Sequence, residues 1–300
     1  WSSGWACSCG SVSRSNPSRR IHPRPDCESL MKITFIGVGN IASALIGGLI
    51  SRGADPGNIT AIDPSAEARA KCSATFGAVA RESVDAGLSE SDVIVLAVKP
   101  QQMQATCGSI SSLLQGQLVI SVAAGVRLQQ LSNWMGGHTR VVRAMPNTPA
   151  VIGLGATGLF ASPEVGGDDR EDASTILGAV SVVSWFDAED DLDSVTAISG
   201  SGPAYVFYFI EAIQAAAEEF GFSSAQARTL TLATFKGAVQ LALESTDPVS
   251  LLRERVTSKG GTTAAALAAF AHDDVASSVK RGVLAAKARS KQLGDELTST

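Results

Sequence analysis

The stretch Lys32–Leu45, KITFIGVGNIASAL, constrains the fold of this chain more than any other. It opens with an apolar run of β-branched and aromatic residues, continues through a glycine turn and ends in a helical pattern. In such a strand–turn–helix unit, the glycines let a pyrophosphate approach the backbone, and the helix N-terminus offers it unpaired N–H groups. A glycine turn without a ligand is the alternative. In this interpretation Gly37 makes the sharp turn, Gly39 leaves room for the pyrophosphate, and the small Ala42 lets the helix pack close to the strand.

Short apolar runs recur along residues 31–189, and helical patterns lie between most of them. Two runs, Val93–Val98 and Leu118–Val122, are apolar almost throughout, which is typical of parallel strands buried on both faces. The alternation predicts an N-terminal Rossmann-like, doubly wound α/β sheet. The other predicted strands are Met31–Ile36, Ile59–Ile62, Val79-Ala80, Val141–Ala144, Gly153–Ala161 and Val182–Phe186. The predicted helices are Asn40–Ser51, Ala66–Phe76, Gln101–Leu114, Leu128–Met135 and Ala173–Val180, with a helical turn or two at Glu82–Leu88.

From residue 190 to residue 300 the strand patterns stop, and the chain reads as an all-helical dimerisation and substrate domain. Tyr205–Ala217 and Leu230–Leu243 are apolar on almost every side, so they need burial on several sides. A domain of this size cannot bury them alone, and we therefore predict a homodimer. The predicted helices are Asp193–Gly221 (interrupted at Ser199–Pro203), Ser224–Ser245, Pro248–Val256, Thr262–Phe270 and Val275–Leu293.

Composition excludes several classes of function. Of the 300 residues 45% are hydrophobic, which excludes general disorder, and the net charge of −5 argues against nucleic acid or an anionic membrane as partner. No apolar run approaches the roughly 20 residues of a membrane span. Only Cys72 and Cys107 lie in the predicted globular part, and neither has metal-ligand spacing, so we predict no metal site and a reduced, cytoplasmic protein.

Residues 1–30 differ from the rest because they are rich in Ser, Arg, Pro and Cys. They show no helical or strand period and no apolar core of a secretory signal. We expect them to be a disordered, non-native extension before the natural start at Met31.

Polar or turn-forming residues follow several predicted strands, as expected of a cofactor groove at the carboxyl ends of a parallel sheet. Asp63 follows Gly39 by 24 residues, near the position, roughly 20 residues on, from which an acidic side chain binds the adenosine ribose of NAD. Ser65 and Arg69 could instead accept the 2′-phosphate of NADP, and Asp63 could simply cap a helix that starts at Pro64. Lys99, after another strand, is either a cofactor contact or a solvated residue.

One polar stretch, Val256–Thr263 (VTSKGGTT), interrupts the apolar helices. Hydroxyls, two glycines and a helix N-terminus form an anion site suited to a carboxylate, although a simple helix cap would have the same pattern. His22, His138 and His272 fall in turns or in the tail, and we see no acid–base constellation. Hydride transfer to an activated acceptor suits such a chain, because the cofactor carries the chemistry.

The blocks FIGVGNIASALIGGL, LAVKPQ, SVAAGV, RAMPNTPA, AISGSGPAYVFYFIEA and VTSKGGTTAAAL, in this order and spacing, strongly resemble pyrroline-5-carboxylate reductases from Met31 to about Leu293. The resemblance implies reduction of 1-pyrroline-5-carboxylate to L-proline by NADPH or NADH, in a homodimer that often assembles into a decamer. Lys259 departs from the family, where many members have proline. The resemblance implies cofactor contacts at Gly37–Ile41, Pro64-Ser65, Val98, Lys99 and Ala124. It implies substrate contacts at Val256, Ser258, Thr262 and Thr263, with Thr263 hydrogen-bonding and helping to protonate the ring nitrogen.

Two other functions are compatible with the pattern. A related imine or 2-hydroxyacid-type dehydrogenase would need a catalytic lysine or histidine on a helix of the second domain, and we find no convincing one. A non-enzymatic dinucleotide-binding regulator would have no use for a carboxylate site at Ser258–Thr263.

Overall fold

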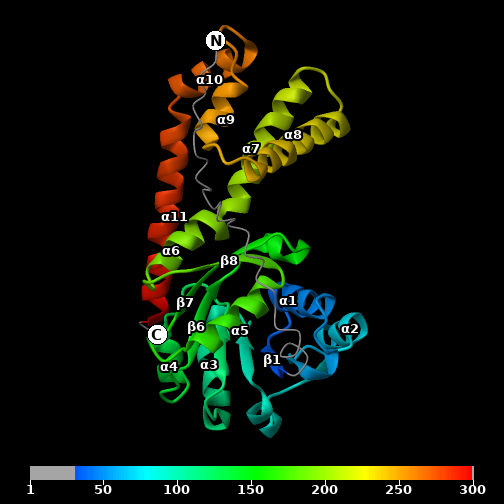
Figure 1. Ribbon diagram of the computed structural model, residues 1–300, viewed down its shortest axis with the longest axis vertical. Coiled ribbons are helices and arrows are strands. Elements are labelled where there is room, and N and C mark those ends of the chain that lie inside the picture. The colour runs from blue at the N-terminus through cyan, green and yellow to red at the C-terminus, as the bar shows by residue number, and fades with distance from the viewer. Residues whose placement is uncertain (1–30, 299–300) are drawn as a thin grey trace, which may run out of the picture.

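The computed structural model describes residues 31–298 and contains one eight-stranded sheet beside an extended group of helices (Figure 1). The strand order is β3-β2-β1-β4-β5-β6-β7-β8, and every neighbouring pair is parallel except β6 and β7. The strands are β1 (Ile33–Ile36), β2 (Ile59–Ile62), β3 (Val79–Arg81), β4 (Val93–Leu96), β5 (Leu118–Ser121), β6 (Val141–Met145), β7 (Gly155–Ala161) and β8 (Ser181–Trp185). Five helices accompany them: α1 (Asn40–Ser51), α2 (Ala66–Phe76), α3 (Pro100–Ile110), α4 (Leu128–Trp134) and α5 (Gly167–Gly178).

The sheet is buried on both faces, because successive strand residues point into two different cores. Phe35 packs into a core with side chains of α1 and α5, whereas its neighbour Ile36 packs into a second core with α3 and α4. Residues on both faces must then be apolar, which explains the continuous apolar runs in the sequence.

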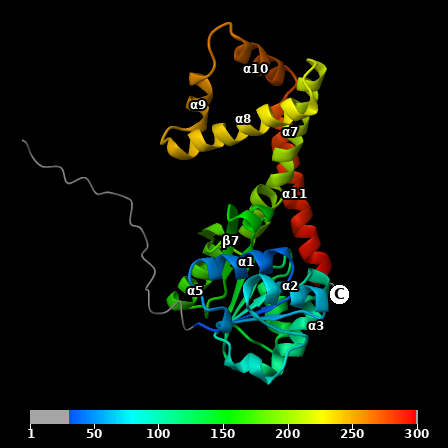
Figure 2. The same cartoon turned by 90° about the vertical axis from the view of Figure 1, so that its right-hand side faces the viewer.

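The remaining helices form what we call the helical arm, residues 191–298, which extends away from the sheet (Figures 1 and 2). Helix α11 starts at the far end of the arm and returns to the sheet, where its last turns lie close to α4 (Figure 1). Neither α7 nor α10 has a single buried residue in this chain, although both are apolar. The arm contains α6 (Asp191–Val195), a π-helical turn (Thr196–Gly200), α7 (Gly202–Glu219), α8 (Ser224–Glu244), α9 (Val249–Arg255), α10 (Thr262–His272) and α11 (Val275–Thr298).

The predicted α/β sheet followed by helices is confirmed, and each predicted strand is present. Several helix boundaries need correction, among them the end of α11, which lies at Thr298 rather than Leu293. Helix α5 starts at Gly167 rather than Ala173, and α3 ends at Ile110, where a 3₁₀ turn takes over. The predicted interruption of the helix Asp193–Gly221 is present, but it starts at Thr196 rather than Ser199, as a π-helical turn that separates α6 from α7. The expected disorder of residues 1–30 lies outside the described residues.

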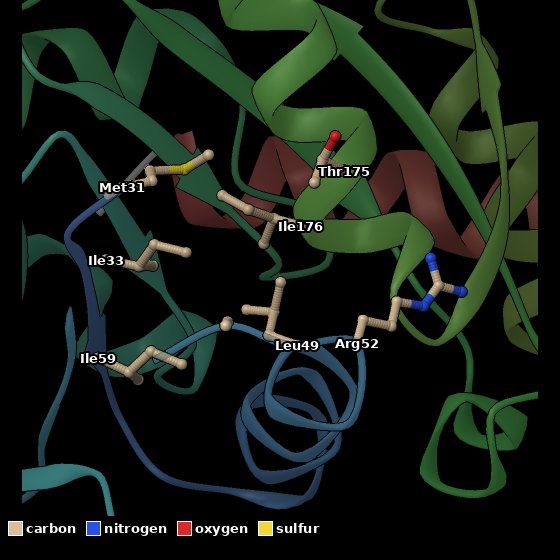
Figure 3. Close-up of a pocket in the computed structure, with 8 residues that line it drawn as sticks. Met31, Ile33, Leu49, Arg52, Ile59, Thr175 and Ile176 are labelled. Carbon is tan, nitrogen blue, oxygen red and sulfur yellow. The ribbon is translucent and has the colours of Figure 1, made fainter. Parts of the chain in front are cut away.

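A small cavity of about 20 Å³ lies between Met31, Leu49 and Ile176 (Figure 3). Ile33 and Ile59, the first residues of β1 and β2, also line it, so it lies at the amino ends of the strands. It has room for about one water molecule, and we interpret it as a packing defect rather than a ligand site.

The close approach of α1 to the turn between α5 and β8 gives a test of the fold. A Cβ added at Gly48 would lie 2.4 Å from Cγ1 of Val180 and 3.1 Å from the carbonyl oxygen of Ala179. We expect Gly48→Ala to lower the free energy of unfolding by about 1–3 kcal/mol, because the packed core must shift. Urea denaturation at a fixed protein concentration measures this.

The matched control is Gly108→Ala on α3, where an added Cβ would meet no atom within 4 Å. This change should stabilise the protein by roughly 0.5–1 kcal/mol, since alanine favours a helix interior. Equal unfolding midpoints for the two variants would contradict the packing described here.

Candidate active site

The glycine turn after β1 is pressed against the end of β4. Gly37 has φ +92°, and a Cβ there would lie 2.8 Å from both the carbonyl carbon and oxygen of Ala97 and 3.0 Å from Cγ1 of Val98. The turn is also held by the Gly37 amide, which donates to the carbonyl of Ile62 at 2.8 Å. Only glycine fits this position, for both conformational and steric reasons.

The N-terminus of α1 is open to a ligand. Gly39 is its cap residue, and among the described residues no side chain caps this end and no acidic residue lies in its first turn. A Cβ added at Gly39 would meet no atom within 4 Å, so the turn faces open space there. Unpaired N–H groups at a helix N-terminus with free space in front of them suit a pyrophosphate.

Asp63 ties this turn to the end of β2. Its two carboxylate oxygens accept hydrogen bonds from the backbone amides of Val38 and Ser65, both at 2.9 Å. Arg69 supports the same loop from α2, because its Nη1 donates to the carbonyls of Asp63 at 2.8 Å and Pro64 at 2.9 Å. Asp63 therefore organises the loop in which the predicted adenosine-side residues lie.

The idea that Asp63 caps α2 is wrong. The cap residue is Ser65, whose hydroxyl accepts from the backbone amide of Ala68 at 3.3 Å, so Pro64 lies before the cap rather than at the first helical position. Ser65 itself remains exposed.

The nicotinamide-side residues that the sequence predicts lie at the carboxyl ends of two neighbouring strands. Val98 and Lys99 follow β4, where Lys99 is exposed and caps α3. Ala124 follows β5 and is also exposed, between the buried residues Ala123 and Gly125. Because β1, β4 and β5 are consecutive in the sheet, these loops adjoin the glycine turn along one edge.

Sequence reasoning missed Asn147, which joins this edge to the helical arm. Its side-chain amide donates to the carbonyl of Ser199 at 3.0 Å, and its side-chain oxygen accepts from the amide of Ala156 at 2.8 Å. Its place directly after a buried strand, in Met145-Pro146-Asn147, was the available signal. A cavity of about 560 Å³ opens beside it, lined by Pro149, Ser199, Gly202, Tyr205 and aromatic residues of α7 and α8.

The predicted substrate loop, Val256–Thr263, lies between α9 and α10 at the far end of the arm, well away from the strand ends (Figures 1 and 2). Gly260 has φ +73°, and a Cβ at Gly261 would lie 2.4 Å from the hydroxyl oxygen of Ser258, so the turn requires both glycines. Gly261 caps α10 without a side-chain hydrogen bond. One chain alone does not bring Thr263 to the coenzyme groove.

Other reactive groups lie outside this groove. Burial raises the pKa of the Cys107 thiol to about 12 and also raises that of Cys72. His138 is half-buried near the amino end of β6, its Nε2 2.9 Å from the carbonyl of Gln117, and burial lowers its pKa. Within residues 31–298, no group of three or more His, Cys, Asp or Glu side chains is arranged to hold a metal ion. No helix in the described part of the chain is long and apolar enough to cross a bilayer.

The fold and the site define a dinucleotide-binding oxidoreductase with an added helical dimerisation region. The family model for NADP oxidoreductase, coenzyme F420-dependent, matches residues 32–125, and the model for pyrroline-5-carboxylate reductase dimerisation matches residues 189–293. The chain belongs to the pyrroline-5-carboxylate reductase family, as its relatives show.

The chain is 43% identical over 270 residues to pyrroline-5-carboxylate reductase of Pseudomonas aeruginosa, covering 90% of this chain and 99% of that protein. Among solved structures, a pyrroline-5-carboxylate reductase from Coxiella burnetii superposes with a TM-score of 0.84 at 40% identity, covering 88% of this chain and 98% of the other. The Plasmodium falciparum enzyme, solved with NADP bound, has a TM-score of 0.79 at 30% identity, covering 89% and 99%.

The role of Asp63 can be tested by coenzyme binding. Asp63→Ala removes the acceptor of the Val38 and Ser65 amides, so we expect the Kd for NADPH to rise about 10-fold, the effect of losing one or two hydrogen bonds. Isothermal titration calorimetry measures Kd, and the fitted stoichiometry accounts for the folded fraction.

Asp55→Ala is the matched control, because Asp55 accepts from the amide of Gly57 at 2.8 Å in a similar turn before β2. Its Kd should equal that of the parent protein. If both variants bind NADPH as the parent does, Asp63 does not organise the coenzyme loop.

Proposed function

We propose that this protein reduces 1-pyrroline-5-carboxylate to L-proline with NADPH or NADH, the last step of proline biosynthesis. Its membership of the reductase family, at 43% identity across 99% of a relative, carries the proposal. In this reaction the C=N carbon gains a hydride and the ring nitrogen gains a proton, which gives the secondary amine of proline.

The groove at the strand ends fits the coenzyme, because an uncapped helix N-terminus and the open space before Gly39 leave room for a pyrophosphate. Gly37–Ile41 would hold that group, and Asp63 and Ser65 would position the adenosine side. Val98, Lys99 and Ala124 would line the nicotinamide side. When bound, the nicotinamide coenzyme supplies the hydride.

The substrate loop Val256–Thr263 supplies binding and proton placement. The uncapped N-terminus of α10 presents backbone N–H groups to the substrate carboxylate, with hydroxyls of Ser258 and Thr262 beside it. Val256 is 66% exposed and offers an apolar surface to the ring. The hydroxyl of Thr263 donates a hydrogen bond to the lone pair that hydride addition leaves on the ring nitrogen, and so helps to protonate it.

The protein acts as a homodimer, and we propose that each active site combines the groove of one chain with the substrate loop of the other. The loop lies at the far end of the arm, and the arm exposes large apolar side chains that a second copy would cover, among them Phe207 at 63% and Tyr208 at 70%. Asn147 and the adjoining cavity mark the place where sheet and arm meet.

We propose that the division into a dinucleotide-binding domain, residues 31–189, and a dimerisation and substrate domain, residues 190–300, follows this split of roles. The dimerisation model, which starts at residue 189, supports that boundary. Assembly of dimers into a decamer and a cytoplasmic location stay predictions.

The activity is tested by oxidation of NADPH or NADH, followed at 340 nm, with 1-pyrroline-5-carboxylate as substrate. We expect turnover with NADPH, and the two KM values give the coenzyme preference. Parallel assays with a 2-oxo acid and an acyclic imine test for a related dehydrogenase. Absence of turnover with both coenzymes would remove the proposal.

Thr263→Ala should lower kcat about 10-fold or more, because it removes a polar contact to the nitrogen that gains a proton. Thr75→Ala, an exposed threonine on α2, is the control and should leave kcat unchanged. Steady-state kinetics at saturating coenzyme measure both, and unchanged kinetics of Thr263→Ala would reject its role.

Mixed dimers test whether the site is shared. Chains with Gly37→Ala have a distorted coenzyme turn, and chains with Thr263→Ala lack the hydroxyl. If each site uses two chains, a mixed dimer has one site with both changes and one intact site, so unfolding and refolding the two variants together restores activity. If each site lies within one chain, mixing restores nothing.

A further inference from the structure

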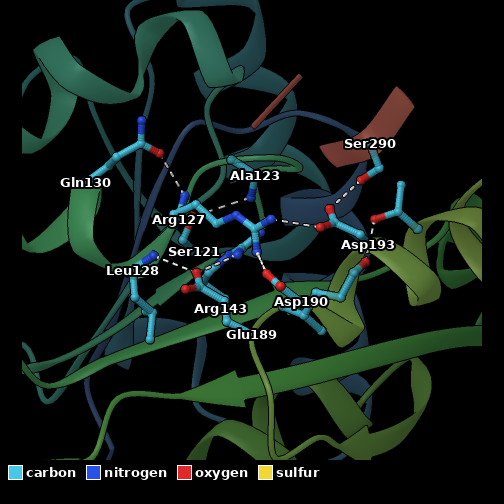
Figure 4. Close-up of polar contacts among 12 residues, drawn as sticks. Ser121, Ala123, Arg127, Leu128, Gln130, Arg143, Glu189, Asp190, Asp193 and Ser290 are labelled. Atoms are coloured by element: carbon cyan, nitrogen blue, oxygen red, sulfur yellow. Dashed lines mark hydrogen bonds and ion pairs between the residues drawn. The ribbon is translucent and has the colours of Figure 1, made fainter. Parts of the chain in front are cut away.

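A cluster of charged residues joins the loop after β5 to α6 and α11, the first and last helices of the helical arm (Figure 4). The guanidinium of Arg127 donates to the carboxylates of Asp190 and Asp193, each at 2.8 Å. The other carboxylate oxygen of Asp193 accepts from the hydroxyl of Ser290 on α11 at 2.7 Å. The side chain of Asp193 is 6% exposed, so three segments distant in the sequence meet at one buried carboxylate.

A second branch holds the backbone of the same loop. One carboxylate oxygen of Glu189 accepts from Nη1 of Arg143 at 2.5 Å and from the amide of Leu128 at 2.7 Å. The Arg143 side chain, on β6, is only 5% exposed. Loop, strand and the start of the arm are thus fixed to one another by Glu189 (Figure 4).

Electrostatics favour a positioning role over a stabilising one. Burial lowers the pKa of Arg143, while for Arg127 the charges of Asp193, Glu189 and Asp190 outweigh burial and raise the pKa. Buried ion pairs gain little net stability, because desolvation offsets most of the attraction. Their directional hydrogen bonds nevertheless fix the relative positions of the segments that carry them.

The end of α11 also touches this loop directly. A Cβ added at Gly294 would lie 3.1 Å from the carbonyl oxygen of Gly125 and 3.6 Å from Nε of Arg127. Gly125, with φ +81°, would in turn bring a Cβ to 3.5 Å from Cδ1 of Leu297. Leu297 packs against the second core of the sheet. Helix α11 therefore contacts the loop after β5 at the buried Gly125, next to the exposed Ala124.

We propose that Arg127, Asp193, Ser290 and Gly294 form a positioning clamp for hydride transfer, in which α11 holds the loop that lines the nicotinamide side. This inference rests on the proposed function, which places Ala124 beside the nicotinamide. None of the four residues touches the reacting atoms. The clamp sets the position of the loop, and hence of the coenzyme's reactive end relative to the substrate.

The clamp should affect the chemical step more than coenzyme affinity. We expect affinity to arise mainly at the glycine turn and the adenosine side, which follow β1 and β2 on the side of the sheet away from α11 (Figure 1). Hydride transfer is sensitive to displacements below 1 Å, which can cost up to about 100-fold in rate. A change that moves the loop by a few tenths of an ångström should therefore slow the reaction and leave binding nearly unchanged.

The test uses Gly294→Ala, which pushes on the carbonyl of Gly125, and Ser290→Ala, which removes one hydrogen bond without adding volume. Gly108→Ala adds the same methyl group to a helix with no atom within 4 Å. The rate constant is measured in a single turnover, with enzyme in excess over NADPH and substrate saturating, because a first-order rate constant does not depend on the fraction of active protein. Fluorescence titration gives the Kd for NADPH.

We expect Gly294→Ala to lower the single-turnover rate constant about 10-fold and Ser290→Ala about 3-fold, with the Kd for NADPH changed less than about 2-fold. Gly108→Ala should match the parent protein in both. Unchanged rate constants in Gly294→Ala and Ser290→Ala would overturn the clamp, and so would a loss of NADPH affinity as large as the loss of rate.

Hydrogen–deuterium exchange of the resting protein separates this inference from the proposed function. Amides of residues 121–130 should exchange faster in Ser290→Ala than in the parent, whether or not the protein turns over pyrroline-5-carboxylate. A parent without turnover would reject the proposed function alone. Unchanged exchange of this segment would reject the clamp alone.

Discussion

The helical arm cannot bury its own apolar surface, and the architecture depends on this constraint. Helix α7 has no buried residue within the chain, and Leu243 of α8 is 75% exposed. At about 25 cal/mol per Å² of apolar surface, cover by a second copy is strongly favourable. In the site that we propose, the same association brings the partner's substrate loop to the strand ends, so that one interface completes both the fold and the active site.

Most of the fold can be predicted from the sequence, because strands buried on two faces leave continuous apolar runs such as Val93–Leu96. Helix α5 shows where this signal ends. Its first turn contains Asp168 and Asp169 and no apolar period, so the hydrophobic pattern starts too late. The helix is started by acidic residues instead, because negative side chains stabilise the positive end of the helix dipole at its N-terminus. Asp169 also accepts a hydrogen bond from the backbone amide of Gly166 there.

The candidate site is predictable only where its requirements are local. Gly37 can be found from the sequence because strand, turn and helix are contiguous. The bond between Asp63 and the amide of Val38 exists only after β1 and β2 pair, and the contacts of Arg127 need the packing of α6 and α11. Thr263, at the start of α10, lies far from the groove of its own chain because the arm extends away from the sheet. No local sequence pattern predicts the direction of the arm.

Because α11 returns to the sheet, a change in the length of the chain has different consequences in the middle of the arm and at its carboxyl end. Residues 202–289 lie between two anchored points and contain the substrate loop, so a change in the length of α8 or α9 would displace that loop and the apolar faces but leave the coenzyme edge in place. The final turns of α11 contact that edge directly. One inserted residue between Ser290 and Leu297 would rotate the rest of the helix by about 100°. Leu297 would then no longer pack against the second core of the sheet. Across this family, insertions and deletions should therefore be absent from the carboxyl end of α11.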